Sequence, residues 1–214
     1  QLKDIYKGVP AVIVGAGPSL ETSLDYLKEL EGKALIFAGG ASLKRSPVYH
    51  IAGGLDPDPS LETSEMEPNM DVPFFYESRF SSRALNHVSG PILQVTSLEG
   101  LHIEDCKCSI DTGCTVTTML LSLALHLGCG PIFLVGIDLA YGEKGDKYSE
   151  NDPETHGDSS LVSYQDRLTQ KDWVVASKWI ESCIHIHSKE SFYSPEISGL
   201  EIQGVQKISL EDLK

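Results

Sequence analysis

The stretch Ala11-Val12-Ile13-Val14-Gly15-Ala16-Gly17-Pro18-Ser19-Leu20 decides the fold. Its first four residues are apolar and predict a buried strand, and Gly15 and Gly17 allow a tight turn directly after it. Pro18 suits a first helical position, because its missing N–H would have no partner there in any case. The order of strand, glycine turn and helix is how α/β domains present backbone N–H groups to a phosphate.

Two interpretations of the turn follow. In the first, the backbone of Gly15-Ala16-Gly17-Pro18 and the Ser19 hydroxyl cradle the phosphate of a small nucleotide. In the second, the segment is a tight β–α turn without a ligand. The dinucleotide fingerprint requires a third glycine three residues after the second, and Leu20 occupies that position, so an NAD site is not indicated.

Strand and helix patterns alternate along the chain. Strands are predicted over 10–14, 33–38, 50–55, 72–76, 91–95, 131–137 and 184–187, and helices over 20–30, 41–44, 115–127 and 161–182, before an extended tail at 202–208 and a last turn at 210–213. The run 131–137 is almost wholly apolar, as in a central parallel strand that is buried on both faces. We therefore expect an α/β, Rossmann-like, three-layer fold with a mostly parallel central sheet, in one domain over 1–214.

Composition excludes several classes of protein. The formal net charge of −14 opposes nucleic-acid binding, and no apolar run reaches the roughly 20 residues of a membrane span. The five cysteines are scattered without a zinc-binding spacing, which indicates reduced thiols and a cytoplasmic location. Because the chain has neither an initiator Met nor a signal-peptide core, we interpret it as a piece excised from a longer protein.

Ligands of parallel α/β sheets bind beyond the carboxyl ends of the strands. This rule selects Gly39, Gly40, Asp56 and Asp138, each of which follows a predicted strand. Asp138 either caps a turn or serves a ligand, by bonding a ribose hydroxyl, orienting a reacting group or holding a metal. Asp56 either forms a turn before a proline or helps to bind Mg²⁺, a hard cation that prefers oxygen ligands.

Two further segments carry candidate residues. Thr112 and Gly113 precede the helix 115–127, where hydroxyls cap the helix or the helix terminus receives a carboxylate or phosphate. The charged, aperiodic segment 142–160 is long for a connector, which is typical of a binding loop or lid.

Three stretches together resemble one family. They are Val14-Gly15-Ala16-Gly17-Pro18-Ser19-Leu20, Asp111-Thr112-Gly113-Cys114-Thr115-Val116, and Leu134-Val135-Gly136-Ile137-Asp138-Leu139-Ala140-Tyr141 with the later Thr155-His156-Gly157. In this order they resemble the 6-hydroxymethylpterin diphosphokinase-like family, which includes bacterial motility accessory factors, and they are similar to sialyltransferases that use CMP-sialic acid. The resemblance implies a Rossmann-like transferase.

The resemblance also implies roles for particular residues. His156 would be the general base that removes the proton of an acceptor hydroxyl, a role that suits an imidazole at neutral pH. Tyr141 and Tyr148 would bond the leaving phosphate, although ordinary packing is the alternative for both and is favoured for Tyr148. The archaeal diphosphokinases of this family have an Asp-x-Asp strand end for a metal. Here the matching stretch is Asp56-Pro57-Asp58-Pro59, in which Asp56 is kept but prolines flank Asp58. This departure shifts weight away from the pterin diphosphokinases.

Three functional hypotheses follow. The first is a transferase that passes a nonulosonate- or sialate-type sugar from a CMP-activated donor to a hydroxyl. The second is a Mg²⁺-dependent diphosphokinase that moves pyrophosphate from ATP to a hydroxymethylpterin, holding ATP without a P-loop. The third is a catalytically inactive domain that binds a nucleotide or a sugar.

Overall fold

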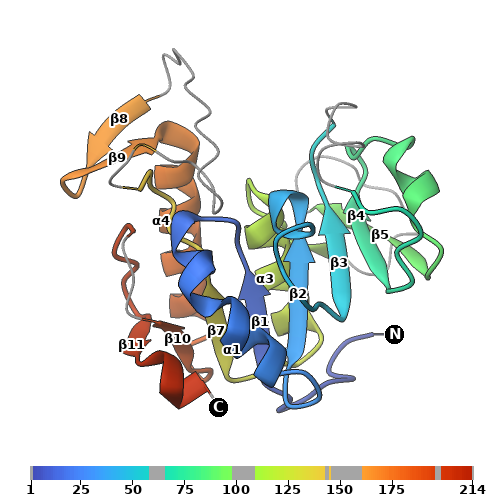
Figure 1. Ribbon diagram of the computed structural model, residues 1–214, viewed down its shortest axis with the longest axis horizontal. Helices are drawn as coiled ribbons and strands as arrows, with labels where there is room; N and C mark the ends of the chain where they lie inside the picture. The colour runs from blue at the N-terminus through green and yellow to red at the C-terminus, as the bar shows by residue number, and fades with distance from the viewer. Residues whose placement is uncertain are drawn as a thin grey trace.

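The computed structural model describes residues 2–57, 66–97, 109–142, 145, 161–195 and 199–213. Within these residues, nine strands form one sheet in the order β11-β10-β7-β1-β2-β3-β4-β5-β6, and every neighbouring pair is parallel (Figure 1). The strands are β1 (Ala11–Val14), β2 (Leu35–Gly39), β3 (Ile51–Gly54), β4 (Phe74–Glu77), β5 (Ile92–Ser97), β6 (Ser109–Ile110), β7 (Ile132–Val135), β10 (Phe192–Pro195) and β11 (Gln206–Ile208). The predicted α/β fold with a parallel sheet is confirmed.

The centre of the sheet consists of β1 between β2 and β7. Val12 lies opposite Ile36 on one side and Phe133 on the other. All four residues of β1 are buried, because helices cover both faces of the sheet at this point. This burial explains why all four residues of β1 are apolar.

Helices form the two outer layers. The helices α3 (Val116–His126) and α4 (Lys171–Ile186) pack on one face, where Met119, Leu120 and Ile180 join the core with Ile13. The 3₁₀ helix η1 (Pro18–Ser23) and α1 (Leu24–Glu29) cover the other face through Leu20 and Leu27. Figure 1 shows α1 in front of the sheet and α3 behind it, which completes the three layers.

Short elements complete the pattern. The helix predicted over 20–30 begins as the 3₁₀ helix η1 and continues as α1, with Pro18 in the first turn of η1. The short helix predicted near 41–44 is the 3₁₀ helix η2 (Gly40–Ser42), and the last turn is η4 (Leu210–Leu213). A further 3₁₀ helix, η3 (Ala84–His87), follows β4.

The prediction for residues 161–187 was wrong at both ends. A hairpin of antiparallel strands, β8 (Leu161–Tyr164) and β9 (Arg167–Gln170), replaces the first part of the predicted helix 161–182. The predicted strand 184–187 is the last turn of α4, where Ile184 is buried and His185 is exposed. The alternation of isoleucine and histidine there imitates the period of a strand but belongs to a helix end.

The N-terminal segment closes the far end of α3. The N–H groups of Asp4 and Tyr6 donate to the carbonyls of His126 and Leu127, at 3.1 and 2.8 Å. These bonds satisfy carbonyls that have no partner inside a helix. In the described part of the chain, none of the helices combines the length and apolar character needed to cross a membrane.

Candidate nucleotide site at the carboxyl edge of the sheet

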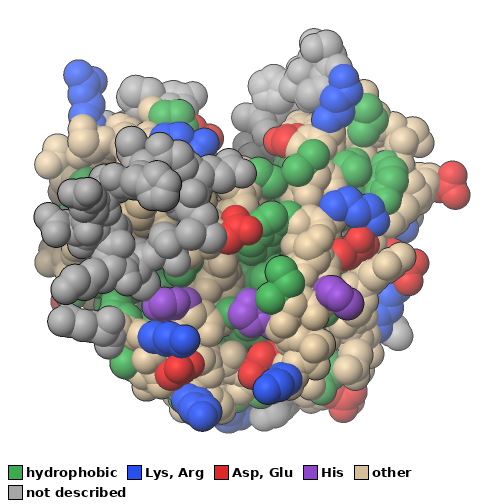
Figure 2. Space-filling model, turned by 180° about the vertical axis from the view of Figure 1, so that it is seen from behind, with side chains coloured by type: hydrophobic (Ala, Val, Ile, Leu, Met, Phe, Trp, Pro, Cys, Tyr) green, Lys and Arg blue, Asp and Glu red, His purple; other side chains and the backbone are tan. Residues whose placement is uncertain are grey.

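The order of the strands places a topological switch point between β1 and β7. From β1 the chain moves outward through β2 to β6, and α3 then returns it to β7 on the opposite side of β1. Ligands of open α/β sheets bind in the crevice at such a point, beyond the carboxyl ends of the strands. Figure 1 shows β1 and β2 pointing to the upper edge, with the β8–β9 hairpin on one side, and Figure 2 shows this edge indented between two lobes.

The glycine loop after β1 is bonded to the end of β7. The N–H groups of Gly15 and Gly17 donate to the carbonyls of Val135 and Gly136, both at 2.8 Å. The Ser19 N–H donates to Asp138 Oδ2 at 2.8 Å, and the Ser19 hydroxyl donates to Asp138 Oδ1. These bonds occupy most of the loop's donors, and among the described residues the amide of Ala16 has no protein acceptor.

Asp138 is therefore a buried partner of the loop. Its exposed fraction is 5%, and a Cβ placed on Gly17 would lie 2.7 Å from its Oδ2. Glycine is required at position 17 by this contact whether or not a ligand binds. The structure thus brings Gly17, Ser19 and Asp138 together as predicted, but it shows the carboxylate fixing the loop. The role of Asp138 in catalysis stays a prediction.

The glycines after β2 have a packing reason of their own. A Cβ on Gly39 would lie 2.5 Å from Val116 Cγ2 in the first turn of α3. The Gly39 N–H donates to the hydroxyl of Ser42 at 2.9 Å, and that hydroxyl donates back to the Gly39 carbonyl. Gly40 has a φ of 56°, in the left-handed region that favours glycine. The small residues thus let the end of β2 approach the start of α3.

The start of α3 is capped by its own threonines. The Thr118 N–H donates to Thr115 Oγ1 at 3.1 Å, and the Thr115 N–H donates to Thr118 Oγ1 at 2.9 Å. Thr112 is buried, and its carbonyl accepts from Thr118 Oγ1 at 2.9 Å. The capping interpretation of this segment is correct for Thr115. The capped terminus still presents the positive end of an eleven-residue helix near Gly39.

Asp111 connects the segment before α3 to α4, a contact that the sequence analysis did not predict. Its Oδ1 accepts from the Gly113 N–H at 3.0 Å, and its Oδ2 accepts from Trp179 Nε1 at 3.0 Å. The φ of Gly113 is 62°, so glycine suits the turn between the aspartate and the helix. The sequence offers the Asp-Thr-Gly turn as a signal but gives no sign of the indole partner 68 residues away.

Tyr141 contacts residues of the β8–β9 hairpin and of α4. Its hydroxyl accepts from Gln170 Nε2 at 2.6 Å, and its ring centroid lies 5.3 Å from that of Trp173. The Tyr141 N–H donates to the Leu168 carbonyl at 2.9 Å, which ties the segment after β7 to the hairpin. Tyr148 and His156 lie outside the described residues.

The carboxylates at the other strand ends differ in their surroundings. Asp56 follows β3 and is exposed, and no group of three metal-ligating side chains occurs among the described residues. Mg²⁺ in proteins is usually bound by one or two carboxylates together with substrate phosphates and waters, so the role of Asp56 toward Mg²⁺ stays a prediction.

Glu77, which sequence reasoning missed, is buried at the end of β4. It accepts from Arg79 Nε at 2.8 Å, the Arg79 N–H at 2.9 Å and the Ser78 hydroxyl at 2.8 Å. Burial alone raises the pKa of Glu77, but the hydrogen bonds from Arg79 and Ser78 outweigh it and leave the pKa below its usual range. Glu77 is thus an ionised partner that holds Arg79 at the carboxyl edge.

Comparisons with known proteins give the family and the fold of the chain. A family model described as 6-hydroxymethylpterin diphosphokinase MptE-like matches residues 1–144. Among solved structures, the MAf glycosyltransferase from Magnetospirillum magneticum AMB-1 is similar, with a TM-score of 0.77 and 16% sequence identity. The match covers 99% of this chain and 35% of that one, so the chain spans about a third of that protein's length. No curated protein matches the chain.

Proposed function

The chain belongs to the 6-hydroxymethylpterin diphosphokinase MptE-like family, and we propose that it is a nucleotide-dependent transferase. The reaction moves a nonulosonate- or sialate-type glycosyl group from a CMP-activated donor to a hydroxyl. One observation carries the proposal, namely the glycine loop of β1 at the switch point beside β7. The fold shared with a glycosyltransferase supports this choice of reaction.

In this proposal different groups of the chain bind the phosphate, position the loop and accept the proton. The loop backbone around Ala16 and the positive end of α3 receive the phosphate of the donor, and Asp138 keeps the loop in place through Ser19. His156 takes the proton of the acceptor hydroxyl. The new bond from the acceptor oxygen to the glycosyl carbon forms as the bond from that carbon to the CMP phosphate oxygen breaks, and CMP leaves with the electron pair.

A second candidate function is a diphosphokinase that uses ATP and Mg²⁺. The description of the matching family model favours it. In that case Asp56 would contribute a metal ligand, together with groups outside the described residues.

Nucleotide binding distinguishes the candidates. Thermal unfolding is measured with CMP, CTP, ATP, GTP and UDP, with and without Mg²⁺. A ligand at 100 times its Kd stabilises a protein by about 2.7 kcal/mol, so CMP and CTP are expected to raise the Tm without Mg²⁺. A rise that requires both ATP and Mg²⁺ would favour the diphosphokinase instead. An unchanged Tm with all five nucleotides would contradict both functions.

Two variants separate binding from chemistry. His156→Ala is expected to keep the affinity for CMP while losing transfer of the glycosyl group. Asp56→Asn serves as the matched control, because it removes a carboxylate that the glycosyl transfer does not need. Full transfer activity in His156→Ala would eliminate it as the base, and a loss of activity confined to Asp56→Asn would point to the metal-dependent reaction.

A further inference from the structure

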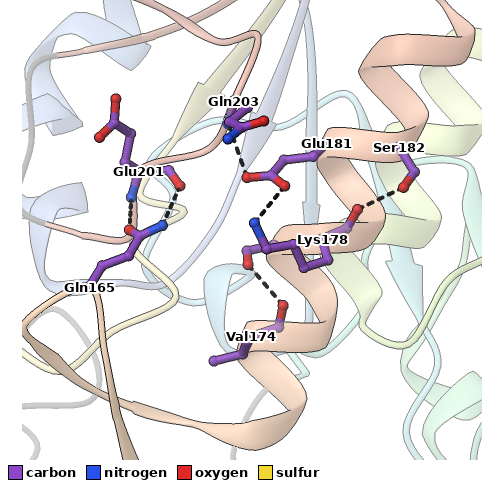
Figure 3. Close-up of polar contacts among 8 residues, drawn as sticks. Gln165, Val174, Lys178, Glu181, Ser182, Glu201 and Gln203 are labelled. Carbon is purple, nitrogen blue, oxygen red and sulfur yellow. Dashed lines mark hydrogen bonds and ion pairs between the residues drawn. The ribbon is translucent and has the colours of Figure 1, made fainter.

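The C-terminal segment 199–205, which we call the strap, contacts three elements that are distant in sequence. It lies against the end of β7, the turn of the β8–β9 hairpin and the side of α4. Figure 3 shows the hairpin and helix contacts, with Gln165 on one side of the strap and Glu181 on the other. The strap therefore joins the hairpin to the segment after β7 that contains Asp138.

Gln165 binds the strap as a backbone would. Its Oε1 accepts from the Glu201 N–H at 2.6 Å, and its Nε2 donates to the Glu201 carbonyl at 3.1 Å. One carboxamide thus satisfies both backbone groups of a single residue, as a neighbouring strand does. No shorter side chain at position 165 could span this contact in the same geometry.

The neighbouring residue of the strap bonds the end of β7. The Leu200 N–H donates to the Asp138 carbonyl at 2.8 Å, and a Cβ on Gly199 would lie 2.6 Å from that same carbonyl oxygen. The side chain of Asp138 accepts both donors of Ser19. A continuous series of bonds therefore leads from Gln165 through the strap and Asp138 to the glycine loop.

A second anchor holds the strap on α4. The Gln203 N–H donates to Glu181 Oε1 at 3.2 Å, while Lys178 Nζ binds Glu181 Oε2 at 2.7 Å. A Cβ on Gly204 would lie 2.7 Å from Ile184 Cγ2, so the strap passes close over the helix. This anchor fixes the far end of the strap, while Gln165 holds Glu201 next to the residue that bonds Asp138.

Gln165 occupies a strained position. The φ angles of Gln165 and Asp166 are 52° and 57°, in the left-handed region that two-residue hairpin turns require. Asparagine and glycine adopt this region most readily, and glutamine does so at a cost. A glycine at 165 would relieve the turn but could not bind Glu201, so the side chain has a use that the turn alone does not explain.

We infer that Gln165 is a positioning residue, which holds the strap against β7 and so keeps the Asp138 carboxylate on Ser19 of the glycine loop. The inference rests on the proposed function in one respect only, namely that the loop binds a nucleotide. The coupling between hairpin and loop is a property of the chain without ligand.

The test compares Gln165→Gly with Asp166→Gly in the full chain. Both replace a left-handed residue by glycine and relax the same turn, but only the first removes the bonds to Glu201. Amide hydrogen exchange is followed at Ser19, Leu200 and Glu201, and CMP affinity is measured by calorimetry. Gln165→Gly is expected to raise exchange at all three amides by roughly two- to tenfold, the range that losing one ordinary hydrogen bond corresponds to. Asp166→Gly should leave them unchanged.

The readouts also separate this inference from the proposed function. If exchange at Glu201 rises while Ser19 stays protected, or if both variants affect Ser19 equally, the inference is wrong. If the wild-type chain does not bind CMP, the proposed function fails while the exchange data still decide the coupling. Gln165→Met, which keeps the length of the side chain without its polar atoms, gives the same comparison should the glycine variant fail to fold.

Discussion

Ser19 and Ser23 lie on the same 3₁₀ helix, and both are buried, but only one hydroxyl has a partner. The Ser19 hydroxyl donates to Asp138, whereas Ser23 Oγ has no hydrogen-bond partner among the described residues. Ser19→Ala is expected to lower the free energy of unfolding by about 1–3 kcal/mol, because it takes a bond from a buried carboxylate. Ser23→Ala should change it by less than about 0.5 kcal/mol or raise it, since no bond is lost.

Urea unfolding at neutral pH measures this difference. The two substitutions remove the same atom from the same helix, so Ser23→Ala is a control for helix propensity and burial. Equal effects of the two substitutions would show that the bond from Ser19 to Asp138 contributes nothing to stability.

Glu77 gives a prediction about pH. Its pKa is lowered in the folded chain, because the hydrogen bonds from Arg79 and Ser78 outweigh the effect of burial. The folded state therefore binds this proton less readily than the unfolded state. The contribution of Glu77 to stability is complete above the unfolded pKa of about 4.3 and is lost as the pH falls through the lower folded value.

Glu77→Gln is thus expected to cost about 1.5–3 kcal/mol at pH 7, the range for hydrogen bonds to a charged group. The difference between wild type and variant should shrink as the pH falls below about 4. Urea unfolding from pH 7 to pH 3 measures both quantities. A difference that stays constant over this range would mean that the charge of Glu77 is not what stabilises the turn.

Among the elements, those built from short apolar runs were predictable. The strands β1, β2 and β7 and the helix α3 lie close to their expected positions. In these elements a continuous run of apolar residues indicates a buried strand, or a helical spacing of apolar residues indicates a helix. The hairpin β8–β9 was missed because its turn, Gln165-Asp166, contains neither glycine nor asparagine. The strand β10 follows α4 and was missed as well, since its four residues carry no alternation that marks a strand.

The candidate site was predictable where it follows from topology, but not where it depends on side-chain contacts. The switch-point rule brought Gly15, Gly17 and Asp138 together from distant parts of the chain, since topology alone places strand ends at one edge. The rule does not say whether the side chains face a ligand or each other. The bond from Ser19 to Asp138 and the burial of Glu77 depend on side-chain packing, which sequence spacing does not encode.

The capping box of α3 provides a prediction at this scale. Thr118→Val keeps the shape of a fully buried side chain but removes its bonds to the Thr115 N–H and the Thr112 carbonyl. A loss of about 1–3 kcal/mol in the free energy of unfolding is expected. The adjacent Thr117→Val makes the same chemical change on a half-buried side chain. Urea unfolding in which the two variants agree would contradict a structural role for the cap.

For the whole molecule, two buried thiols report on cooperativity. Burial raises the pKa of Cys129 to about 11, and burial together with the charge of Asp111 raises the pKa of Cys183 to about 11. Cys129 lies between α3 and β7, and Cys183 lies on α4. In the folded chain both thiols are expected to resist a thiolate-specific reagent at pH 8, because few are ionised there.

Pulsed labelling at increasing urea, read by peptide mass spectrometry, follows each thiol separately. If residues 1–214 fold as one domain, the two cysteines should become reactive at the same urea concentration. Cys114 is exposed and serves as a control that needs no unfolding. Separate transitions for Cys129 and Cys183 would show that α4 and its neighbours unfold as an independent unit.

The pairing of β1 with β7 has a consequence for how the chain is made. Ala11 pairs with Ile132, so a ribosome must add more than a hundred residues after the first strand before its partner exists. Until then one edge of β1 is open, and Gly15, Gly17 and Ser19 lack the acceptors that Val135, Gly136 and Asp138 provide. A nascent chain that stalls before β7 would therefore expose an open edge of the apolar strand β1, and chaperone binding should be strongest in this interval.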